Sequence, residues 1–400
     1  MTKKILIVTQ HFWPENFRIN DISEHLCGQG YNLTVLTGIP NYPEGKTYQS
    51  YKENPNNFSN YNGVNVVRVP VLPRGSTKIS LMLNYLSFIF FASLFGWWKL
   101  RNYNFDRIFV FGVSPPTVCI PAIFLSKIKG VKITFWILDI WPETLEAVNI
   151  ISNRIFLNLI GAIVRKIYKQ CDKILFTCEE AKLLVQERIP NTTKLGILPN
   201  WTEPIYNKQM LVKKETNSRD SRFRITFAGN IGAAQNFDLI VETAYSLRSM
   251  PILWEIVGSG RYFENLNERV MKLKMQEYFK LNGRVDPEDL VEIYEQSDAL
   301  LISLHKHPAF NVTVPGKFQS YLVFGKPILG FIDGATNELI NDNNIGFAAD
   351  PSKPENILDI VVKLVATSSE ERKQMGECAR KLADKEFDRI NILESVKNHL

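Results

Sequence analysis

The stretch that decides the fold of the second half of the chain is FRITFAGNIG, residues 223–232. Residues 223–228 have the composition of a buried strand, and the glycine-rich turn at 229–232 ends it. A helix is expected next, because apolar side chains recur on one helical face between Phe237 and Leu247. Strand, glycine turn and helix form the geometry in which free backbone N–H groups hold a phosphate. The same pattern also fits an ordinary tight turn.

Short strands alternate with helical patterns along the whole chain. In the first half, strands are expected near residues 4–9, 32–37, 64–71, 106–111, 132–138 and 173–178. In the second half, they are expected near residues 223–228, 252–257, 279–282, 299–303 and 327–331. Continuous apolar runs such as ILIV (5–8) are typical of parallel strands covered by helices on both faces. The sequence therefore predicts an α/β protein with two Rossmann-like, doubly wound parallel-sheet domains that face a cleft.

The two series of strands are separated by a polar stretch without periodicity. Residues 201–221 are expected to form a linker. The first domain then covers residues 1–200 and the second covers residues 222–383. A chain of 400 residues is long enough for two domains of this size.

Charge is divided unevenly between the halves. The first 200 residues hold 22 Lys/Arg and 13 Asp/Glu, whereas the last 200 hold 25 and 28. The basic first half favours an anionic partner. No basic cluster is interleaved with stacking aromatics as single-stranded nucleic acids require, so a membrane surface is preferred to nucleic acid.

Several enzyme classes are disfavoured by missing motifs. The five cysteines form no C-x-x-C pair, and the histidines have no metal-ligand spacing, so no disulfide framework and no metal site are expected. The sequence has no G-x-S-x-G and no Walker motif, and the first strand does not lead into G-x-G-x-x-G.

Residues 79–98 break the soluble pattern, because they are uncharged and 15 of the 20 are apolar. The stretch is long enough to span a bilayer, but a span would place strands of one sheet on opposite sides of the membrane. A partial polar stripe also recurs at helical spacing: Ser80, Asn84 and Ser87. Three readings stay open: a helix in the core or a surface groove, a helix at the membrane interface, and a true span. Trp97-Trp98 before Lys99 is an arrangement favoured at lipid headgroups.

A second candidate phosphate site lies at VPGKFQSYLVFG, residues 314–325. A short helix is expected here, with Pro315 at its first position and Gly325 at its end. Val314 would then be the N-cap, and it offers no acceptor to the free amides. Lys317 in the first turn opposes the helix dipole unless an anion is bound. A diphosphate would reconcile these features, and the alternative is that Lys317 points to water.

Three further loops follow predicted strands, where ligands bind in open α/β sheets. In VGSGR (257–261), Gly258 and Gly260 would allow close backbone approach, and in NGRV (282–285) Arg284 would contact a base. In LDIWPE (138–143), Asp139 and Glu143 are candidates for holding acceptor hydroxyls. Each loop also has a structural reading, which for Glu143 is capping of the next helix.

These residues together resemble the retaining glycosyltransferases of family 4, which have the GT-B fold. The matching stretches are FAGNIG (227–232), EIVGSGR (255–261), LNGRV (281–285), SDALLISL (297–304), VPGKFQSYLVFGKPIL (314–329), NELI (337–340), WPENFRIND (13–21), VLTGIPNYPEGK (35–46), SPPT (114–117) and LDIWPE (138–143). The resemblance covers nearly the whole chain. It points to the bacterial subgroup that transfers fucose-type sugars, including N-acetyl-L-fucosamine, during O-antigen, capsule or colanic acid assembly.

The resemblance implies a set of site residues. The donor diphosphate would be held by Gly229, Asn230, Gly232, Pro315, Gly316 and Lys317. Arg284 and the loop with Gly258 and Gly260 would border the base. The loop around Glu15, Asn16, Phe17 and Arg18 would lie close to the transferred sugar. Ser320 and Glu338 would be further donor-binding residues. Lys317, Asp139 and Glu143 would serve catalysis, and residues 384–400 would form a last helix that returns to the first domain. The chain departs from the family where Val312 and Ser320 replace two glutamates and Asn230 and Gln235 replace a basic pair.

The implied activity is transfer of a sugar from a nucleoside diphosphate sugar to a polyprenyl-diphosphate-linked saccharide, with retained configuration. No metal and no cofactor are expected, and the base is uridine or guanosine. The implied location is the cytoplasm, peripheral at the inner face of the bacterial plasma membrane. Two alternatives are a nucleotide-sugar epimerase on the same fold and a non-catalytic nucleotide-sugar-binding scaffold.

Overall fold

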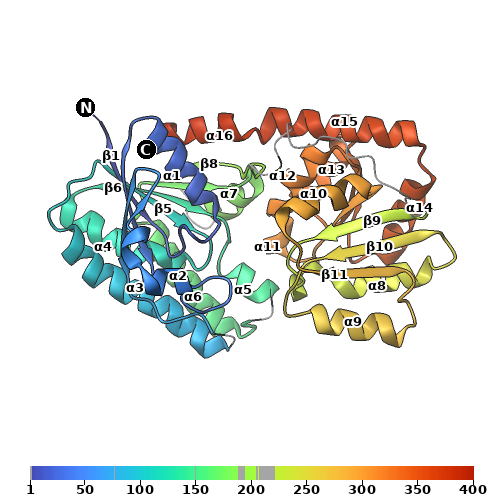
Figure 1. The fold of residues 1–400 in the computed structure, drawn as a ribbon, viewed down its shortest axis with the longest axis horizontal. Helices are drawn as coiled ribbons and strands as arrows, with labels where there is room; N and C mark the ends of the chain where they lie inside the picture. Colours follow the sequence, from blue (N-terminus) through green and yellow to red (C-terminus); the bar gives the residue numbers. More distant parts are fainter. Residues whose placement is uncertain (1, 76, 149, 188–193, 204–205, 207–220) are drawn as a thin grey trace. The chain divides into compact units, whose positions relative to one another are not determined.

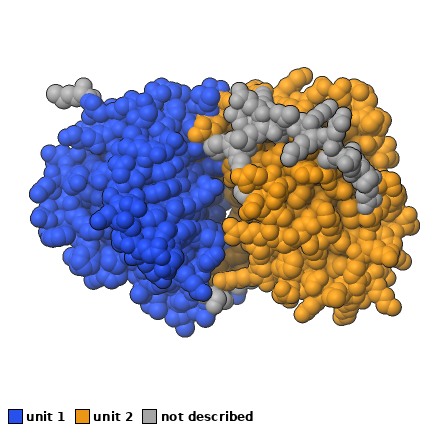
Figure 2. All heavy atoms as spheres, viewed as in Figure 1, with its two compact units in different colours: residues 1–145, 151–199, 390–400 blue, residues 146–150, 200–389 orange. Residues whose placement is uncertain are grey.

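The computed structural model divides the chain into two compact units (Figures 1 and 2). Unit 1 comprises Met1–Leu145, Ile151–Pro199 and Ile390–Leu400, and unit 2 comprises Glu146–Ile150 and Asn200–Arg389. The structure describes residues 2–75, 77–148, 150–187, 194–203, 206 and 221–400. The predicted linker at 201–221 therefore lies mostly outside the described residues.

Unit 1 is built on an eight-stranded sheet. Its strands are β1 (Lys4–Val8), β2 (Asn32–Gly38), β3 (Asn60–Tyr61), β4 (Val64–Val69), β5 (Arg107–Gly112), β6 (Lys132–Ile137), β7 (Lys173–Phe176) and β8 (Leu195–Ile197). The order is β3-β4-β2-β1-β5-β6-β7-β8, and every pair except β3–β4 is parallel. From β4 to β7 this is the Rossmann order 3-2-1-4-5-6, so the direction of winding reverses between β1 and β5.

Helices connect the strands of unit 1 (Figure 1). They are α1 (Arg18–Gly28), α2 (Gln49–Glu53), α3 (Lys78–Leu100), α4 (Cys119–Lys129), α5 (Glu143–Ala147), α6 (Arg154–Tyr168), α7 (Glu179–Gln186) and the terminal α16 (Arg389–Val396). The chain end contacts both α1 and the sheet. Glu394 pairs with His25 at 3.3 Å, and Thr134 donates a hydrogen bond to the carbonyl of His399 at 2.6 Å.

Helix α3 contains the apolar stretch that the sequence left with three readings. Its polar stripe faces the unit's interior, where buried Asn84 accepts a hydrogen bond from Gln10 at 2.7 Å and donates one to the Leu72 carbonyl at 2.5 Å. Ser87 accepts from the Leu72 amide at 2.9 Å. Among the described residues, this helix is long and apolar enough to cross a membrane. Only 28% of its most apolar 18-residue stretch is buried. One face of α3 is thus packed on the unit and the rest is exposed.

Unit 2 has a six-stranded sheet in which every pair is parallel. Its strands are β9 (Phe223–Ala228), β10 (Ile252–Val257), β11 (Phe279–Gly283), β12 (Ala299–Ser303), β13 (Ile328–Phe331) and β14 (Gly346–Ala349). The order β11-β10-β9-β12-β13-β14 is again 3-2-1-4-5-6, with the reversal between β9 and β12.

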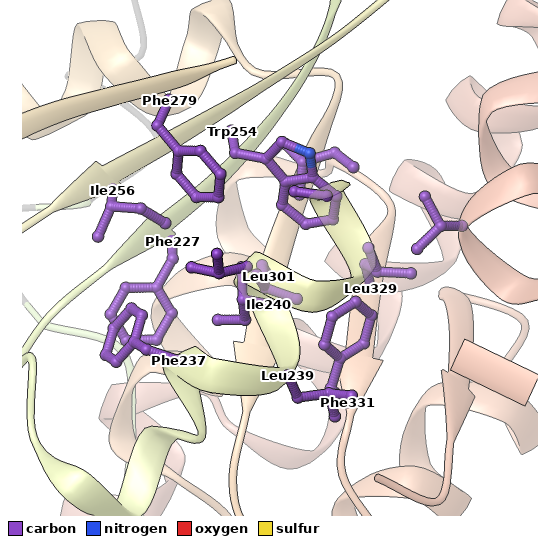
Figure 3. Close-up of a cluster of buried hydrophobic side chains, with 14 of the residues drawn as sticks. Phe227, Phe237, Leu239, Ile240, Trp254, Ile256, Phe279, Leu301, Leu329 and Phe331 are labelled. Carbon is purple, nitrogen blue, oxygen red and sulfur yellow. The ribbon is translucent and has the colours of Figure 1, made fainter. Parts of the chain in front are cut away.

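The helices of unit 2 cover this sheet. They are α8 (Phe237–Ser246), α9 (Phe263–Lys272), α10 (Pro287–Gln296), α11 (Pro308–Asn311), α12 (Gly316–Phe324), α13 (Ala335–Asp342), α14 (Pro354–Ala366) and α15 (Ser369–Glu386). Strand and helix side chains form one buried core, with large rings such as Phe227, Phe237 and Trp254 at its centre (Figure 3). This core fixes the carboxyl ends of β9 and β12, where the candidate site lies.

All eleven predicted strands are present, and the doubly wound α/β class is confirmed. Three strands were not predicted. Two of them, β3 and β8, have two and three residues, too few for a pattern. The third, β14, has the sequence GFAA and lacks the β-branched residues that mark a strand.

Candidate functional site

The carboxyl end of β9 lies at the switch point of unit 2, where ligands bind in open α/β sheets. Immediately after β9, Gly229 is exposed and has a positive φ of 141°. Helix α12 is attached to this point through Tyr321, whose hydroxyl accepts a hydrogen bond from the Ala228 amide at 2.9 Å. The first turn of α12, with Lys317, is therefore held beside the turn at Gly229.

Lys317 carries an ammonium group that has no hydrogen-bonding partner among the described residues and is enclosed by protein. Its Nζ lies 3.5 Å from the centroid of the Phe227 ring. A Cβ placed on Gly229 would lie 3.2 Å from the same Nζ, so the glycine leaves this space to the lysine. Burial lowers the pKa of Lys317 from 10.5 to about 7, because a desolvated cation is unfavourable without an anion. Cation–π attraction to Phe227 offsets only part of that cost.

The start of α12 differs by one residue from the prediction. Pro315, not Val314, is the N-cap, and the helix begins at Gly316. Pro315 makes no side-chain hydrogen bond to the helix and has no group able to do so. A Cβ on Gly316 would meet nothing within 4 Å. The expected feature, a helix start without a side-chain cap, is therefore present one position later.

The turns after β9 and β10 pack backbone against backbone. The amide of Gly229 donates to the Val257 carbonyl at 2.9 Å, and that of Ile231 donates to the Ser259 carbonyl at 2.9 Å. A Cβ on Gly258 would lie 1.8 Å from the Gly229 oxygen, and one on Gly260 would lie 2.1 Å from the Ile231 oxygen. The structure thus gives these two glycines a local reason: they admit the neighbouring turn.

A Gly258→Ala substitution is therefore expected to destabilise unit 2. Its φ is 139°, and the added methyl group would overlap the Gly229 carbonyl. The expected loss is about 2 kcal/mol or more, seen as a lower midpoint in thermal unfolding. Gly316→Ala is the matched control, because its Cβ meets open space, and it should change stability by less than about 0.5 kcal/mol. Equal effects of the two substitutions would contradict this account.

The remaining predicted donor residues are more scattered. Asn230 and Arg284 are exposed on the turns after β9 and β11. The amide of Gly232 donates a hydrogen bond to the side-chain oxygen of Gln235 at 3.1 Å. Ser320 is buried within α12, and Glu338 is exposed on α13. Within the described part of the chain, no contact joins Arg284 or Glu338 to Lys317. The structure brings together Lys317, Gly229 and the start of α12.

In unit 1, the two predicted carboxylates have different surroundings. Burial raises the pKa of Asp139 to about 6, opposed by a hydrogen bond with Ser114, whose hydroxyl also accepts from the Trp141 indole at 3.1 Å. Glu143 is the first residue of α5. It lines a cavity of about 300 Å³ whose other walls include Trp141, Arg165 and Tyr168.

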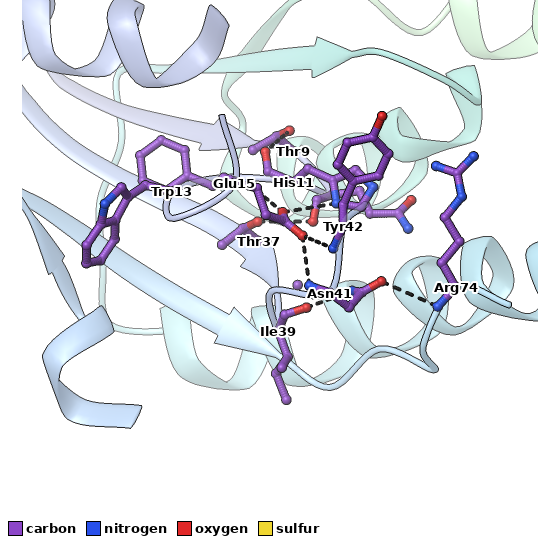
Figure 4. Close-up of polar contacts among 12 residues, drawn as sticks. Thr9, His11, Trp13, Glu15, Thr37, Ile39, Asn41, Tyr42 and Arg74 are labelled. Atoms are coloured by element: carbon purple, nitrogen blue, oxygen red, sulfur yellow. Dashed lines mark hydrogen bonds and ion pairs between the residues drawn. The ribbon is translucent and has the colours of Figure 1, made fainter. Parts of the chain in front are cut away.

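The loop after β1 carries Glu15 and Arg18, which the resemblance places close to the transferred sugar, and it holds a polar cluster that includes His11 (Figure 4). His11 and Glu15 are both buried and lie 3.0 Å apart, between Nδ1 and Oε2. Its sequence signal was a histidine four residues before a glutamate in the loop that follows the first strand. Arg18, the predicted residue of this loop, begins α1 and is partly exposed.

Helices α3, α4 and α6 expose many large apolar side chains, and α4 contacts both of the others. The exposed residues are Ile79, Met82, Leu83, Leu86, Phe90, Leu94, Phe95, Trp97, Trp98, Phe124, Ile128, Ile155, Phe156, Leu159 and Ile163. We call this set the apolar face. Exposed basic residues accompany it: Lys127 on α4, and Arg154 and Lys166 on α6. Lys99 instead donates to the Arg68 carbonyl at 2.8 Å.

Comparisons with known proteins agree with this architecture. Residues 209–382 match the family described as Glycosyl transferases group 1. Over 343 residues, the chain is 23% identical to the putative colanic acid biosynthesis glycosyl transferase WcaI of Escherichia coli (strain K12), covering 80% of this chain and 81% of that one.

Solved structures show the same fold over the whole chain. Anabaena Alr3699/HepE in complex with UDP has a TM-score of 0.70 at 12% identity, covering 100% of this chain and 99% of the other. WaaG, a glycosyltransferase involved in lipopolysaccharide biosynthesis, has a TM-score of 0.65 at 16% identity, covering 99% and 98%. The protein has the GT-B fold, and its second half carries a glycosyl transferases group 1 domain. It is a glycosyltransferase, related to WcaI.

Proposed function

We propose that this glycosyltransferase moves a fucose-type sugar from a nucleoside diphosphate sugar to a lipid-linked saccharide, with retained configuration. The observation that carries the proposal is the enclosed, unpartnered ammonium of Lys317 beside Gly229. Side-chain rotation would take this ammonium from the Phe227 ring to a diphosphate lying on the exposed turn. The uncapped start of α12 would supply amides and the positive end of a helix dipole to the same anion.

The chemistry assigned to these groups is stabilisation of the leaving diphosphate. Breaking the bond from the anomeric carbon to the phosphate oxygen leaves positive charge on the sugar and negative charge on the diphosphate. Lys317 and the amide of Gly316 would stabilise that negative charge. The acceptor oxygen then bonds to the anomeric carbon from the same face, and its proton goes to the leaving phosphate. The proposal needs no separate base, and it assigns the positive charge to protein groups rather than to a metal.

The relatives support a place in surface polysaccharide synthesis. The E. coli relative is described as a colanic acid biosynthesis glycosyl transferase, and WaaG as an enzyme of lipopolysaccharide biosynthesis. HepE has been solved with UDP and glucose. These descriptions favour sugar transfer over the epimerase and scaffold alternatives. The fucose-type sugar itself rests on the sequence resemblance.

A lipid-linked acceptor requires access to a membrane, and the apolar face supplies it. We propose that α3, α4 and α6 lie in the headgroup region of an anionic membrane. Apolar side chains in the interface, with basic residues around them, are the composition of surface-bound helices. Each lysine or arginine near an anionic surface contributes about 1 kcal/mol, reduced by salt.

The pH dependence of diphosphate binding tests the assignment of Lys317. In the folded protein without a bound anion, Lys317 has a pKa of about 7. Above pH 7 an anion must therefore bind together with a proton. The affinity for UDP or GDP is therefore expected to be flat below pH 7 and to fall by up to about tenfold per pH unit above it. The terminal phosphates of UDP and GDP, with a last pKa of about 6, gain negative charge as the pH rises, so their ionisation would not weaken binding above pH 7.

Calorimetric titration between pH 6.5 and 9 measures this effect, with UDP, GDP and inorganic pyrophosphate as probes. A Lys317→Met variant should bind weakly and without the pH slope. Wild-type protein that binds none of the three probes, or binds them equally at pH 6.5 and 9, would contradict the proposed site. Mass spectrometry of a lipid-linked acceptor incubated with a panel of sugar nucleotides then identifies the donor.

A further inference from the structure

The loop after β1 lies at the switch point of unit 1, where β1 and β5 are neighbours and the winding reverses. It is therefore placed as a ligand-binding loop of this sheet. Phe17 is the last residue of the loop, and its ring contacts Phe111 of β5 with ring centroids 6.5 Å apart. His11 and Glu15 lie inside this loop. The resemblance places the loop close to the transferred sugar but names no contact for His11 and gives Glu15 no defined part.

Glu15 is only 2% exposed, and both of its carboxylate oxygens are occupied by donors (Figure 4). Oε1 accepts from the amides of Asn41 at 2.8 Å and Tyr42 at 2.7 Å, in the loop after β2. Oε2 accepts from the amide of Phe12 at 3.2 Å and faces His11 Nδ1 at 3.0 Å. The carboxylate thus joins two loops and orients the imidazole, and it has little capacity left for a ligand.

The contact with Glu15 determines what His11 presents. A carboxylate only accepts hydrogen bonds, so the neutral ring carries its proton on Nδ1 and leaves a lone pair on Nε2. Among the described residues, no hydrogen-bonding partner of Nε2 is found, and this nitrogen is not one of the enclosed unpartnered atoms. Nε2 is therefore the atom of the ring that a ligand can reach.

Aromatic rings fix the plane of the imidazole. Phe17 stacks on His11 with centroids 5.3 Å apart and planes at 14°, and Tyr42 lies 5.3 Å away at 53°. The Arg74 guanidinium lies 5.4 Å from the centroid of the Tyr42 ring. A lone-pair nitrogen among aromatic faces suits a sugar, because a hydroxyl can donate to the nitrogen while C–H groups pack on a ring.

We propose that His11 Nε2 accepts a hydrogen bond from a sugar hydroxyl and that Glu15 is the residue that positions it. This inference rests on the proposed sugar transfer. The sugar belongs to the donor or to the acceptor saccharide, since both carry hydroxyls. Glu15 does not touch the sugar, and its contribution passes through the tautomer and orientation of His11.

Two substitutions of His11 separate ligand contact from a structural role. The amide of Asn reaches the position of Nδ1, so His11→Asn keeps the bond to Glu15 and removes the acceptor at Nε2. The amide of Gln reaches the position of Nε2, so His11→Gln keeps an acceptor there and loses the bond to Glu15. The expected kcat/KM for sugar transfer is 10- to 100-fold below wild type for Asn, with part of the activity recovered in Gln.

Thermal unfolding and UDP binding are the control measurements. In His11→Asn, the unfolding midpoint and the affinity for UDP should equal those of wild type, because neither depends on the sugar contact. Wild-type transfer by His11→Asn would overturn the inference. So would an activity order in which Asn exceeds Gln in parallel with stability, because that order marks a purely structural histidine. Failure of the proposed sugar transfer itself would show in a different measurement. In that case the wild-type protein and both His11 variants would bind no diphosphate.

Hydrolysis of the sugar nucleotide without acceptor identifies which sugar is held. If His11 binds the donor sugar, His11→Asn lowers hydrolysis and transfer together. If it binds the acceptor, hydrolysis stays at the wild-type rate and the KM for the acceptor rises. Either pattern supports the contact, and unchanged values of all three quantities contradict it.

Discussion

A Lys317→Met variant is expected to lose about 10²–10³-fold in turnover while remaining folded. The ammonium of Lys317 is the positive side chain enclosed beside Gly229, where the diphosphate is proposed to lie. Removing one preorganised group that faces a developing negative charge typically costs this factor. Steady-state kinetics over a range of sugar-nucleotide concentrations measures the loss, and the effect should fall on kcat as well as on KM.

Lys363→Met is the matched control for this substitution. Lys363 also lies over an aromatic ring, with Nζ 4.2 Å from the centroid of Phe347, but it is exposed on α14. Its loss should leave turnover within about twofold of wild type, as for most surface substitutions. Turnover of Lys317→Met close to that of the control would remove the diphosphate from this part of unit 2.

The Lys317→Met variant should be more stable than wild type when no ligand is bound. The pKa of Lys317 falls from 10.5 to about 7 in the folded chain, so between these values the unfolded chain binds more protons. Wild-type stability therefore rises with pH across this window, and the cost of the buried cation is fully present below pH 7. Replacing the lysine by methionine removes a cost on the order of a few kcal/mol and should raise the unfolding midpoint by several degrees.

The strands were predictable because parallel strands buried on both faces leave long apolar runs in the sequence. The runs at 5–8 and 252–257 are examples, and both lie inside observed strands. The start of α12 was one residue off, because Pro315 fits the N-cap as well as the first helical position. Sequence alone gives no dihedral angle with which to choose between them.

A site residue could be predicted from the sequence only where the residues that give it its significance are close to it in the chain. Lys317 could be found from the sequence, because a lysine in the first turn of a helix conflicts with the helix dipole. His11 could not, because its significance comes from Glu15, Tyr42 and the neighbouring strand, which only the fold brings together. Gly258 and Gly260 were expected to border a nucleotide base. A Cβ on either glycine would also meet the turn after β9, a neighbour that the sequence could not place.

The apolar stretch of α3 shows the same division. Its composition was visible in the sequence, but the contribution of α4 and α6 was not. On α6, apolar residues lie on both sides: Ile155, Phe156, Leu159 and Ile163 are exposed, and Leu157 and Val164 are buried. Only the exposure of the apolar side of the helix distinguishes it from a core helix, and exposure is a property of the fold.

Charge placed on the apolar face is expected to release the protein from membranes. A variant with Phe90→Glu and Trp98→Glu on α3 and Phe156→Glu and Leu159→Glu on α6 replaces four exposed side chains. Each would otherwise bury apolar area worth about 1 kcal/mol or more in the interface, and each glutamate is also repelled by anionic lipid. Binding to vesicles of mixed zwitterionic and anionic lipid should fall by more than about 100-fold in a flotation assay.

A control with Met271→Glu and Val362→Glu changes exposed apolar residues of α9 and α14 in unit 2 and should bind vesicles as wild type does. Wild-type binding should weaken in high salt and on purely zwitterionic vesicles, because the basic residues beside the face then lose their partner. Size-exclusion chromatography separates a membrane surface from a protein interface. A wild-type dimer that the four glutamates dissociate, with vesicle binding unchanged, would assign the apolar face to a second copy of the chain.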